Sequence, residues 1–110
     1  MFGNGLAKVQ RLIEKNKDAD LAKLVGSKDP AVQMAAIEGL GKVRGEVGFN
    51  TLVALLRSPE AKIRVAVASA MGEYGDPKLR AHIDHLIKNE TDPKVMEALH
   101  EALGKIKEKI

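Results

Sequence analysis

The residues best suited to metal chemistry are two histidines in the stretch His82-Ile83-Asp84-His85. Their spacing of three places both imidazoles on one face of a helix, where they would hold a metal ion if a third ligand converged on them. The corresponding positions of two earlier repeats, described below, carry acidic, basic or small residues and no histidine. This column pattern is typical of a polar outer surface, so we expect no metal site and no cofactor.

The remaining reactive side chains do not form a catalytic set. Ser27 and Ser58 fall in expected turns and Ser69 on an expected helix, none with a histidine or lysine at a useful spacing. Glu97 and Glu101 are four residues apart, which makes them a like-charge pair on one helix face. We interpret them as an acidic patch and not as an acid and base. The sequence therefore predicts a protein that is not an enzyme.

Nucleic acid is not an expected partner either. The net charge of +3 is dispersed along the chain, and the aromatic content of 3 % offers no stacking platform. Acidic residues stand where three helices are expected to begin, and they would repel phosphate there: Asp29, Glu60 and Asp92. A small basic patch remains conceivable near those turns, made of Lys62, Arg64 and Lys94. Weak nucleic-acid binding is therefore kept as an alternative.

Composition points to a soluble, cysteine-free domain. The absence of cysteine excludes disulfides and fits a reducing compartment. No apolar run is long enough to cross a membrane, and the first residues lack the apolar segment of a signal peptide. We expect a cytoplasmic protein with no membrane partner. Its core must consist of leucine, isoleucine, valine, alanine and methionine.

The same pattern of residues occurs three times along the chain. Leu24, Leu55 and Leu86 are separated by 31 residues each. Later positions repeat with steps of 31 and 32, so the third copy has one extra residue in its internal turn. Each copy also has a proline in that turn: Pro30, Pro59 and Pro93. Periods of this length indicate a repeat architecture, in which each copy is one supersecondary unit.

Each copy reads as a shorter helix, a turn and a longer helix. In the first copy the apolar residues of the longer helix recur at intervals of three and four from Val32 to Val43. Asp29 and Asp92 precede prolines as expected N-caps, Ser58-Pro59-Glu60 is expected to do the same, and Gly45 and Gly75 are expected to end helices. The predicted helices are 18–26, 30–43, 47–57, 60–74, 78–89 and 93–108. An additional helix near 5–15, capped by Asn4, is expected to cover the open end of the first repeat.

Three segments carry a resemblance to a known family: DPAVQMAAIEGLGKV, PEAKIRVAVASAMGEYGD and DPKVMEALHEALGKI. They resemble short HEAT-like repeats of the phycobilisome-lyase type, over about residues 18–108. The resemblance implies an all-α solenoid of three helical-hairpin repeats with an N-terminal capping helix. The implied units of the single domain 1–110 are 1–17, 18–45, 46–76 and 77–110. The family places arginine after the buried valine, where it bonds acids between repeats. In this chain the three residues at that position are Gln33, Arg64 and Met96, so only the second repeat keeps the arginine.

One column of the longer helices is glycine in all three copies: Gly41, Gly72 and Gly104. Glycine costs a helix interior about 1 kcal/mol relative to alanine, so its recurrence needs a reason. On a helical wheel this column lies about 160° from the centre of the unit's own core face. We predict that it faces a concave groove, where bulk would crowd the closest approach of successive helices. The alternative is that it merely weakens the last helical turn.

The face that carries this column is the predicted binding surface. Its apolar floor is expected to be Met34, Ile37, Val65 and Ala68, and its polar end Glu97, His100 and Glu101. An exposed apolar strip of this kind favours a protein or peptide partner, although the N-terminal helix or self-association could also cover it. The expected function is therefore a non-catalytic scaffold or adaptor. The family resemblance keeps a bilin lyase-like accessory subunit as the alternative.

Overall fold

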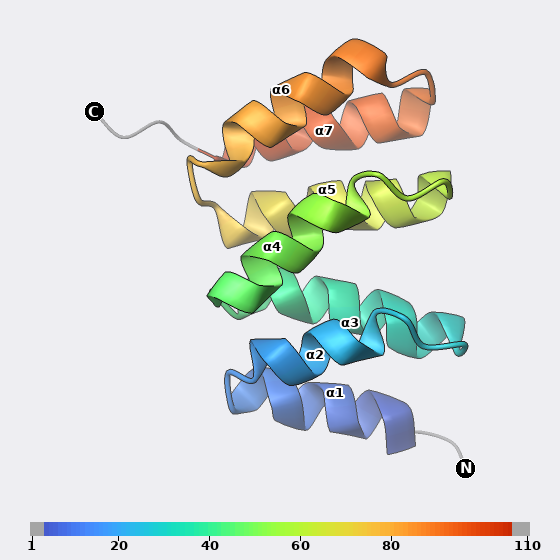
Figure 1. Cartoon of the computed structure of the whole chain (residues 1–110), viewed down its shortest axis with the longest axis vertical. Helices are drawn as coiled ribbons and strands as arrows, with labels where there is room; N and C mark the ends of the chain where they lie inside the picture. Colours follow the sequence, from blue (N-terminus) through green and yellow to red (C-terminus); the bar gives the residue numbers. More distant parts are fainter. Residues whose placement is uncertain (1–3, 107–110) are drawn as a thin grey trace.

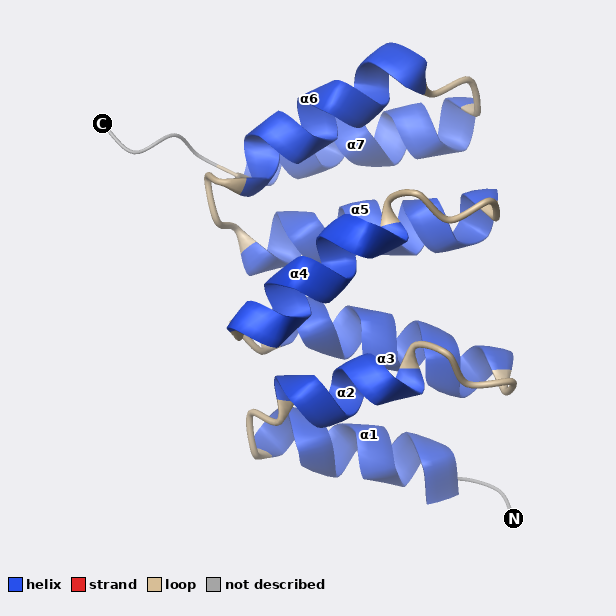
Figure 2. Ribbon diagram, in the orientation of Figure 1, coloured by secondary structure: helices blue, strands red, loops and turns tan. Residues whose placement is uncertain are grey.

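The structure is a computed structural model that describes residues 4–106, in which the chain forms seven helices and no strand (Figures 1 and 2). In chain order they are α1 (Asn4–Glu14), α2 (Asp18–Leu24), α3 (Pro30–Lys42), α4 (Glu46–Leu55), α5 (Ala61–Tyr74), α6 (Leu79–Asn89) and α7 (Pro93–Lys105). Each helix lies where the repeat pattern predicts it. The prediction that the last helix extends to residue 108 falls partly outside the described residues.

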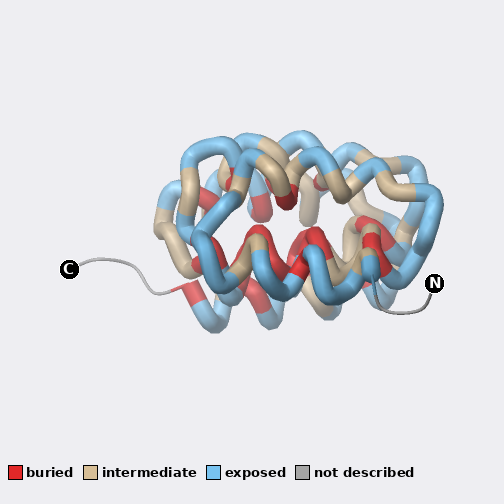
Figure 3. Tube along the Cα trace, turned by 90° about the horizontal axis from the view of Figure 1, so that it is seen from below, coloured by how far each residue is buried: buried red, intermediate tan, exposed pale blue. Residues whose placement is uncertain are grey.

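The helices form a solenoid of two layers. The longer helices α3, α5 and α7 stack on one another with α1 beneath them, and the shorter helices α2, α4 and α6 form the second layer (Figure 1). Buried residues are concentrated between the layers, while the outer sides are exposed (Figure 3). The body measures 41 × 31 × 18 Å, and its thinnest dimension fits two layers of helices. The predicted α-solenoid of helical hairpins is confirmed.

Two of the three expected N-caps form as the sequence predicts. The Asp29 carboxylate accepts from the Ala31 amide at 3.0 Å, and that of Asp92 accepts from the Lys94 amide at 2.8 Å. In each case proline takes the first helical position, because it has no amide that needs a partner. The middle repeat differs. Glu60 occupies the N-cap position of α5 without capping it, and the Ser58 hydroxyl accepts from the Glu60 amide instead.

The two glycines predicted to end helices have different roles. Gly75 has φ +76° and ends α5 in the left-handed conformation, as predicted. Gly45 is extended and precedes α4, so the prediction for this residue is wrong. A Cβ at Gly45 would overlap the carboxylate of Asp18, which accepts from the Gly48 amide at 2.9 Å. Gly45 is therefore small because a side chain of the first repeat reaches across it to the second.

The glycine column marks the contacts between successive longer helices. A Cβ on Gly41 would lie 2.6 Å from the carbonyl oxygen of Ala70 in α5, and one on Gly72 would lie 3.2 Å from the Cα of Ala102 in α7. The expectation of crowding at the closest helix approach is confirmed at both positions. The expectation that the column faces a groove is wrong, because the next longer helix occupies that side. A Cβ on Gly104 would meet no described atom within 4 Å.

Helix α1 is stacked as if it were a longer helix that lacks its shorter partner. It packs against α3 and α2, which confirms that it covers the open end of the first repeat. Ile13 of α1 takes the place that glycine has in the later repeats, and it lies against Gly39 of α3. A Cβ on Gly39 would lie 3.0 Å from the Ile13 side chain. At this contact the glycine is therefore on the later helix, α3, whereas at the contacts of Gly41 and Gly72 it is on the earlier helix.

The arginine column behaves differently in each repeat. Arg64 donates to both carboxylate oxygens of Glu90, at 2.9 and 3.1 Å, and to the Ser58 carbonyl at 2.7 Å. Glu90 belongs to the third repeat, so this pair connects the second and third units, as the family pattern implies. Gln33 donates at 2.8 Å to the Val25 carbonyl of its own repeat. The hydrogen bond from Arg64, together with those from the Asp92 and Thr91 amides, lowers the pKa of Glu90 despite its burial.

Candidate partner-binding surface

The predicted apolar floor is mostly packed inside the solenoid. Ile37 and Ala68 are 0 % exposed, so the prediction that they belong to an exposed strip is wrong. Met34 and Val65 are half-buried and pack against the core. Ile37 stands one helical turn before Gly41, and Ala68 one turn before Gly72, on the sides that face the next longer helix. These side chains hold consecutive repeats together.

The polar end of the prediction lies where the stack stops. Glu97, His100 and Glu101 are all exposed on α7. Glu97 and His100 occupy columns that are apolar in the earlier repeats, and no further longer helix covers them in the described part of the chain. The column of Glu101 is polar in the earlier repeats as well. Whether these three residues bind a partner stays a prediction.

A furrow runs along the outer side of the longer helices. Between α1 and α3 lies a hollow of about 220 Å³, and between α3 and α5 another of about 210 Å³. Both are lined by Glu38 and Lys42, so the two hollows are neighbours on either side of these α3 side chains. We name the two hollows together the second-helix furrow, after the longer, second helix of each repeat. The residues that line it are Leu6, Val9, Gln10, Ile13, Ala35, Glu38, Lys42, Ser69, Ala70 and Glu73.

The second-helix furrow combines apolar and polar side chains. At its α1 end Leu6 lies beside the polar residues Gln10 and Glu38, and it is 46 % exposed, the most exposed large apolar side chain among residues 4–106. Its α5 end is polar, with Ser69 and Glu73. A further small hollow of about 30 Å³ between α5 and α7 continues from Ser69 to Glu101, a residue of the predicted site.

The charged side chains of the furrow are free to bind a ligand. Glu38, Lys42 and Glu73 of the furrow, and Glu101 of the small hollow beside it, make no side-chain hydrogen bond or ion pair with the part of the chain that the structure describes. When a partner orients and desolvates such charged groups, they contribute more to the selection of the partner sequence than to the binding affinity. The furrow therefore offers an apolar anchor point followed by unpaired polar groups.

The sequence contained a signal for this surface that the prediction did not use. Two further columns of the longer helices are polar or charged, Glu38, Ser69 and Glu101 in one and Lys42, Glu73 and Lys105 in the other. They mark the side that no neighbouring helix covers. The predicted binding surface lay instead on the side of the longer helices that carries the glycine column. Leu6 and Gln10 could not be assigned to the furrow because α1 was not recognised as part of the row of longer helices.

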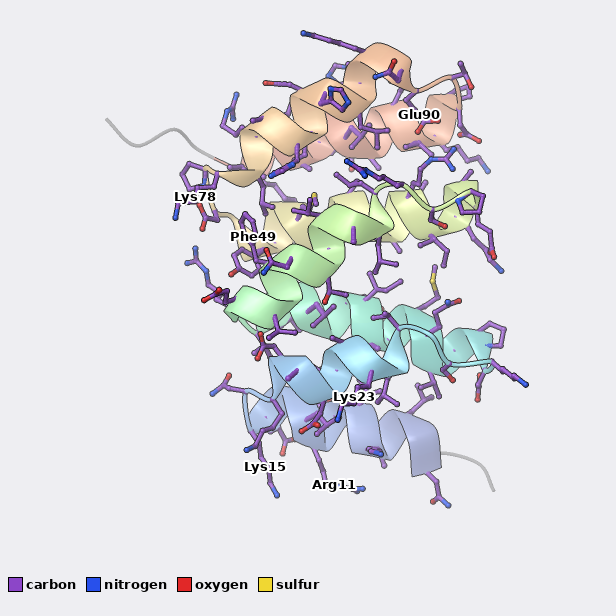
Figure 4. All side chains as sticks on the ribbon, in the orientation of Figure 1. Arg11, Lys15, Lys23, Phe49, Lys78 and Glu90 are labelled. Carbon is purple, nitrogen blue, oxygen red and sulfur yellow. The ribbon has the colours of Figure 1, made fainter. Side chains whose placement is uncertain are left out.

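A second hollow, of about 410 Å³, lies where α4 meets the turn between α5 and α6. It is lined by Glu46, Phe49, Asn50, Tyr74, Asp76 and Lys78. Phe49 and Lys78 lie on the same side of the molecule in Figure 4. The Phe49 and Tyr74 rings meet edge to face with centroids 5.8 Å apart, and Phe49 also contacts His82 at 6.4 Å. Sequence reasoning did not bring these rings together.

The groups at this aromatic hollow are already engaged with the protein. The Tyr74 hydroxyl donates to the Gly45 carbonyl at 3.1 Å, and the guanidinium of Arg44 lies 5.4 Å from the Tyr74 ring centre. Burial raises the pKa of Tyr74, and the charge of Asp76 raises it further. The rings thus join the second and third repeats, and we regard this hollow as a packing seam.

The two histidines are exposed on α6, as their columns predict. Together with Val53, Leu56 and other residues they line a hollow of about 100 Å³ between α4 and α6. Within residues 4–106, no three histidine, cysteine, aspartate or glutamate side chains gather as a metal-binding group. None of the described helices is both long and apolar enough to span a membrane.

The stacked hairpins correspond to a known protein family. A family model described as HEAT repeats matches residues 49–109, which is more than half of the chain. The chain belongs to the HEAT-repeat family. The match covers most of α4 and all of α5, α6 and α7, and the first repeat has the same hairpin and glycine contact. A search of curated proteins finds no match to this HEAT-repeat chain.

Proposed function

We propose that this HEAT-repeat protein is a non-catalytic scaffold that binds a protein or peptide along the second-helix furrow. The observation that carries the proposal is that two hollows lie next to each other on either side of α3 and share Glu38 and Lys42. A surface that crosses three helices suits an extended segment of a partner better than a small molecule. HEAT repeats are in general protein-interaction modules, which agrees with this function.

The chemistry of the furrow defines the partner segment. An apolar side chain would enter the α1–α3 hollow beside Leu6 and Ile13. Basic groups would then pair with Glu38 and Glu73, and an acidic group with Lys42. Apolar burial supplies most of the affinity of such contacts, and the charges fix the direction of the segment.

Two exposed apolar residues allow a matched test. Leu6 in the furrow and Val47 on α4 are 46 % and 45 % exposed, and they lie on different layers. We would compare Leu6→Glu and Val47→Glu in a pull-down from lysate, after circular dichroism shows that both variants remain helical. We expect Leu6→Glu to lose a partner that the wild type and Val47→Glu both capture. Equal capture by all three proteins, or loss with both variants, would contradict the proposed surface.

The finer predictions from the sequence have their own tests. A phycobilisome-lyase-type role predicts a change in bilin absorbance when the protein and chromophore are mixed. Nucleic-acid binding predicts affinity for random DNA that falls steeply with salt. The absence of either response would leave protein binding as the proposal, and a cytoplasmic location would be checked by fractionation.

A further inference from the structure

The two ends of the helix stack carry opposite charge. At the first end, Lys8 and Arg11 of α1 and Lys15 directly after it are spaced by three and four residues, and all three are exposed. This spacing places them on one face, about 180° around the helix from Ile13, which packs inward against Gly39. Arg11 and Lys15 project away from the rest of the stack in Figure 4. The outward face of α1 is therefore basic.

The outward face of α7 is acidic. Within about 60° of the line of Gly104 lie Glu97 and Glu101 on one side and His100 on the other, and all four residues are exposed. Lys94 and Lys105 are about 80–100° around the helix from Gly104, on the same side as the two glutamates, so they border this face without occupying its centre. At Gly104 a Cβ would meet nothing within 4 Å among the described residues. This column is open at α7, whereas Gly41 and Gly72 receive the next helix.

The internal contacts define how a further helix would be placed on α7. In each of them, a residue of the glycine column contacts the residue two positions before the same column in the next longer helix. The pairs are Ile13 with Gly39, Gly41 with Ala70, and Gly72 with Ala102. The residue two positions before Ile13 is Arg11. Repeating the same stacking step with a second copy of the chain therefore places its Arg11 opposite Gly104.

We propose that the α1 end of one copy docks on the α7 end of another, with Arg11 over Gly104 and on the side of Glu101 and Glu97. Lys8 and Lys15 extend the basic face along α1 and face the same acidic surface. Arg11 is long where the internal contacts have alanine or glycine, so the two copies stand further apart than consecutive repeats do. The junction is held mainly by charge and is therefore sensitive to salt. Because it joins unlike ends, copies add head to tail.

Sedimentation velocity of the full chain tests this junction directly. We would follow the weight-average mass from about 20 µM to about 1 mM protein, at salt concentrations of about 20 mM and about 500 mM. We expect the mass to rise above the monomer value of 11.9 kDa with concentration at low salt, and to return to it at high salt. A wild-type protein that stays monomeric at the highest concentration and low salt would overturn the proposal.

Charge reversal identifies the faces. Arg11→Glu with Lys15→Glu makes both ends acidic, and Glu97→Lys with Glu101→Lys makes both ends basic, so each variant should associate at least about tenfold more weakly than wild type. An equimolar mixture of the two variants restores one acidic and one basic face, and should regain association. As a control, Glu38→Lys with Glu73→Lys changes net charge as much as the α7 variant but leaves both ends intact, and should associate like wild type. Association that survives reversal, or a mixture that stays monomeric, would contradict the assigned faces.

Discussion

Alanine substitution along the glycine column separates a packing requirement from a weak helical turn. The three positions have the same column but different surroundings. A Cβ on Gly41 would lie 2.6 Å from the carbonyl oxygen and 2.9 Å from the Cα of Ala70. Backbone atoms cannot rotate away, so α3 and α5 must separate. At Gly72 the nearest atoms lie at 3.2 Å and beyond, and one belongs to the flexible end of Lys105. At Gly104 no described atom lies within 4 Å of the added Cβ.

The expected changes in the free energy of unfolding follow from two opposing effects. Alanine gains up to about 1 kcal/mol over glycine inside a helix, and overpacking costs about 1–3 kcal/mol. For Gly41→Ala we take the upper cost because the obstacle is backbone, which leaves a net loss of about 2 kcal/mol. Gly72→Ala should stay within about 0.5 kcal/mol of wild type. Gly104→Ala should gain about 0.5 kcal/mol, since its position in the last turn reduces the benefit.

Urea denaturation followed by circular dichroism measures all three. Stability is compared through the midpoint and slope, and an unchanged slope shows that the unfolded state is the same. We expect Gly41→Ala to be the least stable of the proteins, Gly72→Ala to be close to wild type, and Gly104→Ala to be the most stable. If Gly41→Ala and Gly104→Ala raised stability equally, the glycines would be weak turns and the packing argument would be refuted.

Two further predictions concern single contacts. The hydrogen bond from Arg64 lowers the folded-state pKa of Glu90, so the stabilisation is present above the unfolded value of 4.5 and is lost as pH falls through the lower folded pKa. Acid unfolding of Glu90→Gln should therefore depend less on pH than that of wild type. An unchanged dependence of stability on pH would count against the Arg64–Glu90 pair. Asp92→Ala should cost about 1 kcal/mol through loss of the α7 cap, whereas Glu60→Ala, at a position that caps nothing, should cost far less in the same urea assay.

The helices and their stacking unit could be read from the sequence because their signals are local. The apolar period, the prolines after Asp29 and Asp92, and the recurrence at 31 residues each act within one repeat. The predictions for the Glu60 cap and the Gly45 helix end were wrong. At Gly45 the cause is tertiary, because Asp18 of the preceding helix pair occupies the space beside it, whereas at Glu60 the Ser58 hydroxyl accepts from the Glu60 amide and the Glu60 side chain forms no cap.

The candidate site was only partly predictable. The wheel showed correctly that Gly41 and Ile37 face away from their own unit's core, but it could not say what covers that side. Solvent and the next repeat are equivalent on a single-helix wheel. The polar columns that begin at Glu38 and Lys42 were the better indicator of exposure, since unpaired charge is rarely buried.

By itself, the sequence determined an all-helical solenoid with a glycine in each longer helix, because periodicity and capping depend on residues close in the chain. Only the tertiary structure decided which side each repeat presents to the next. That direction fixes Ile13 against Gly39, Gly41 against Ala70, and an open Gly104 at the last helix. It also pairs Arg64 with Glu90, 26 residues away. Such contacts depend on how rigid hairpins stack in space, and no local signal in the chain specifies that geometry.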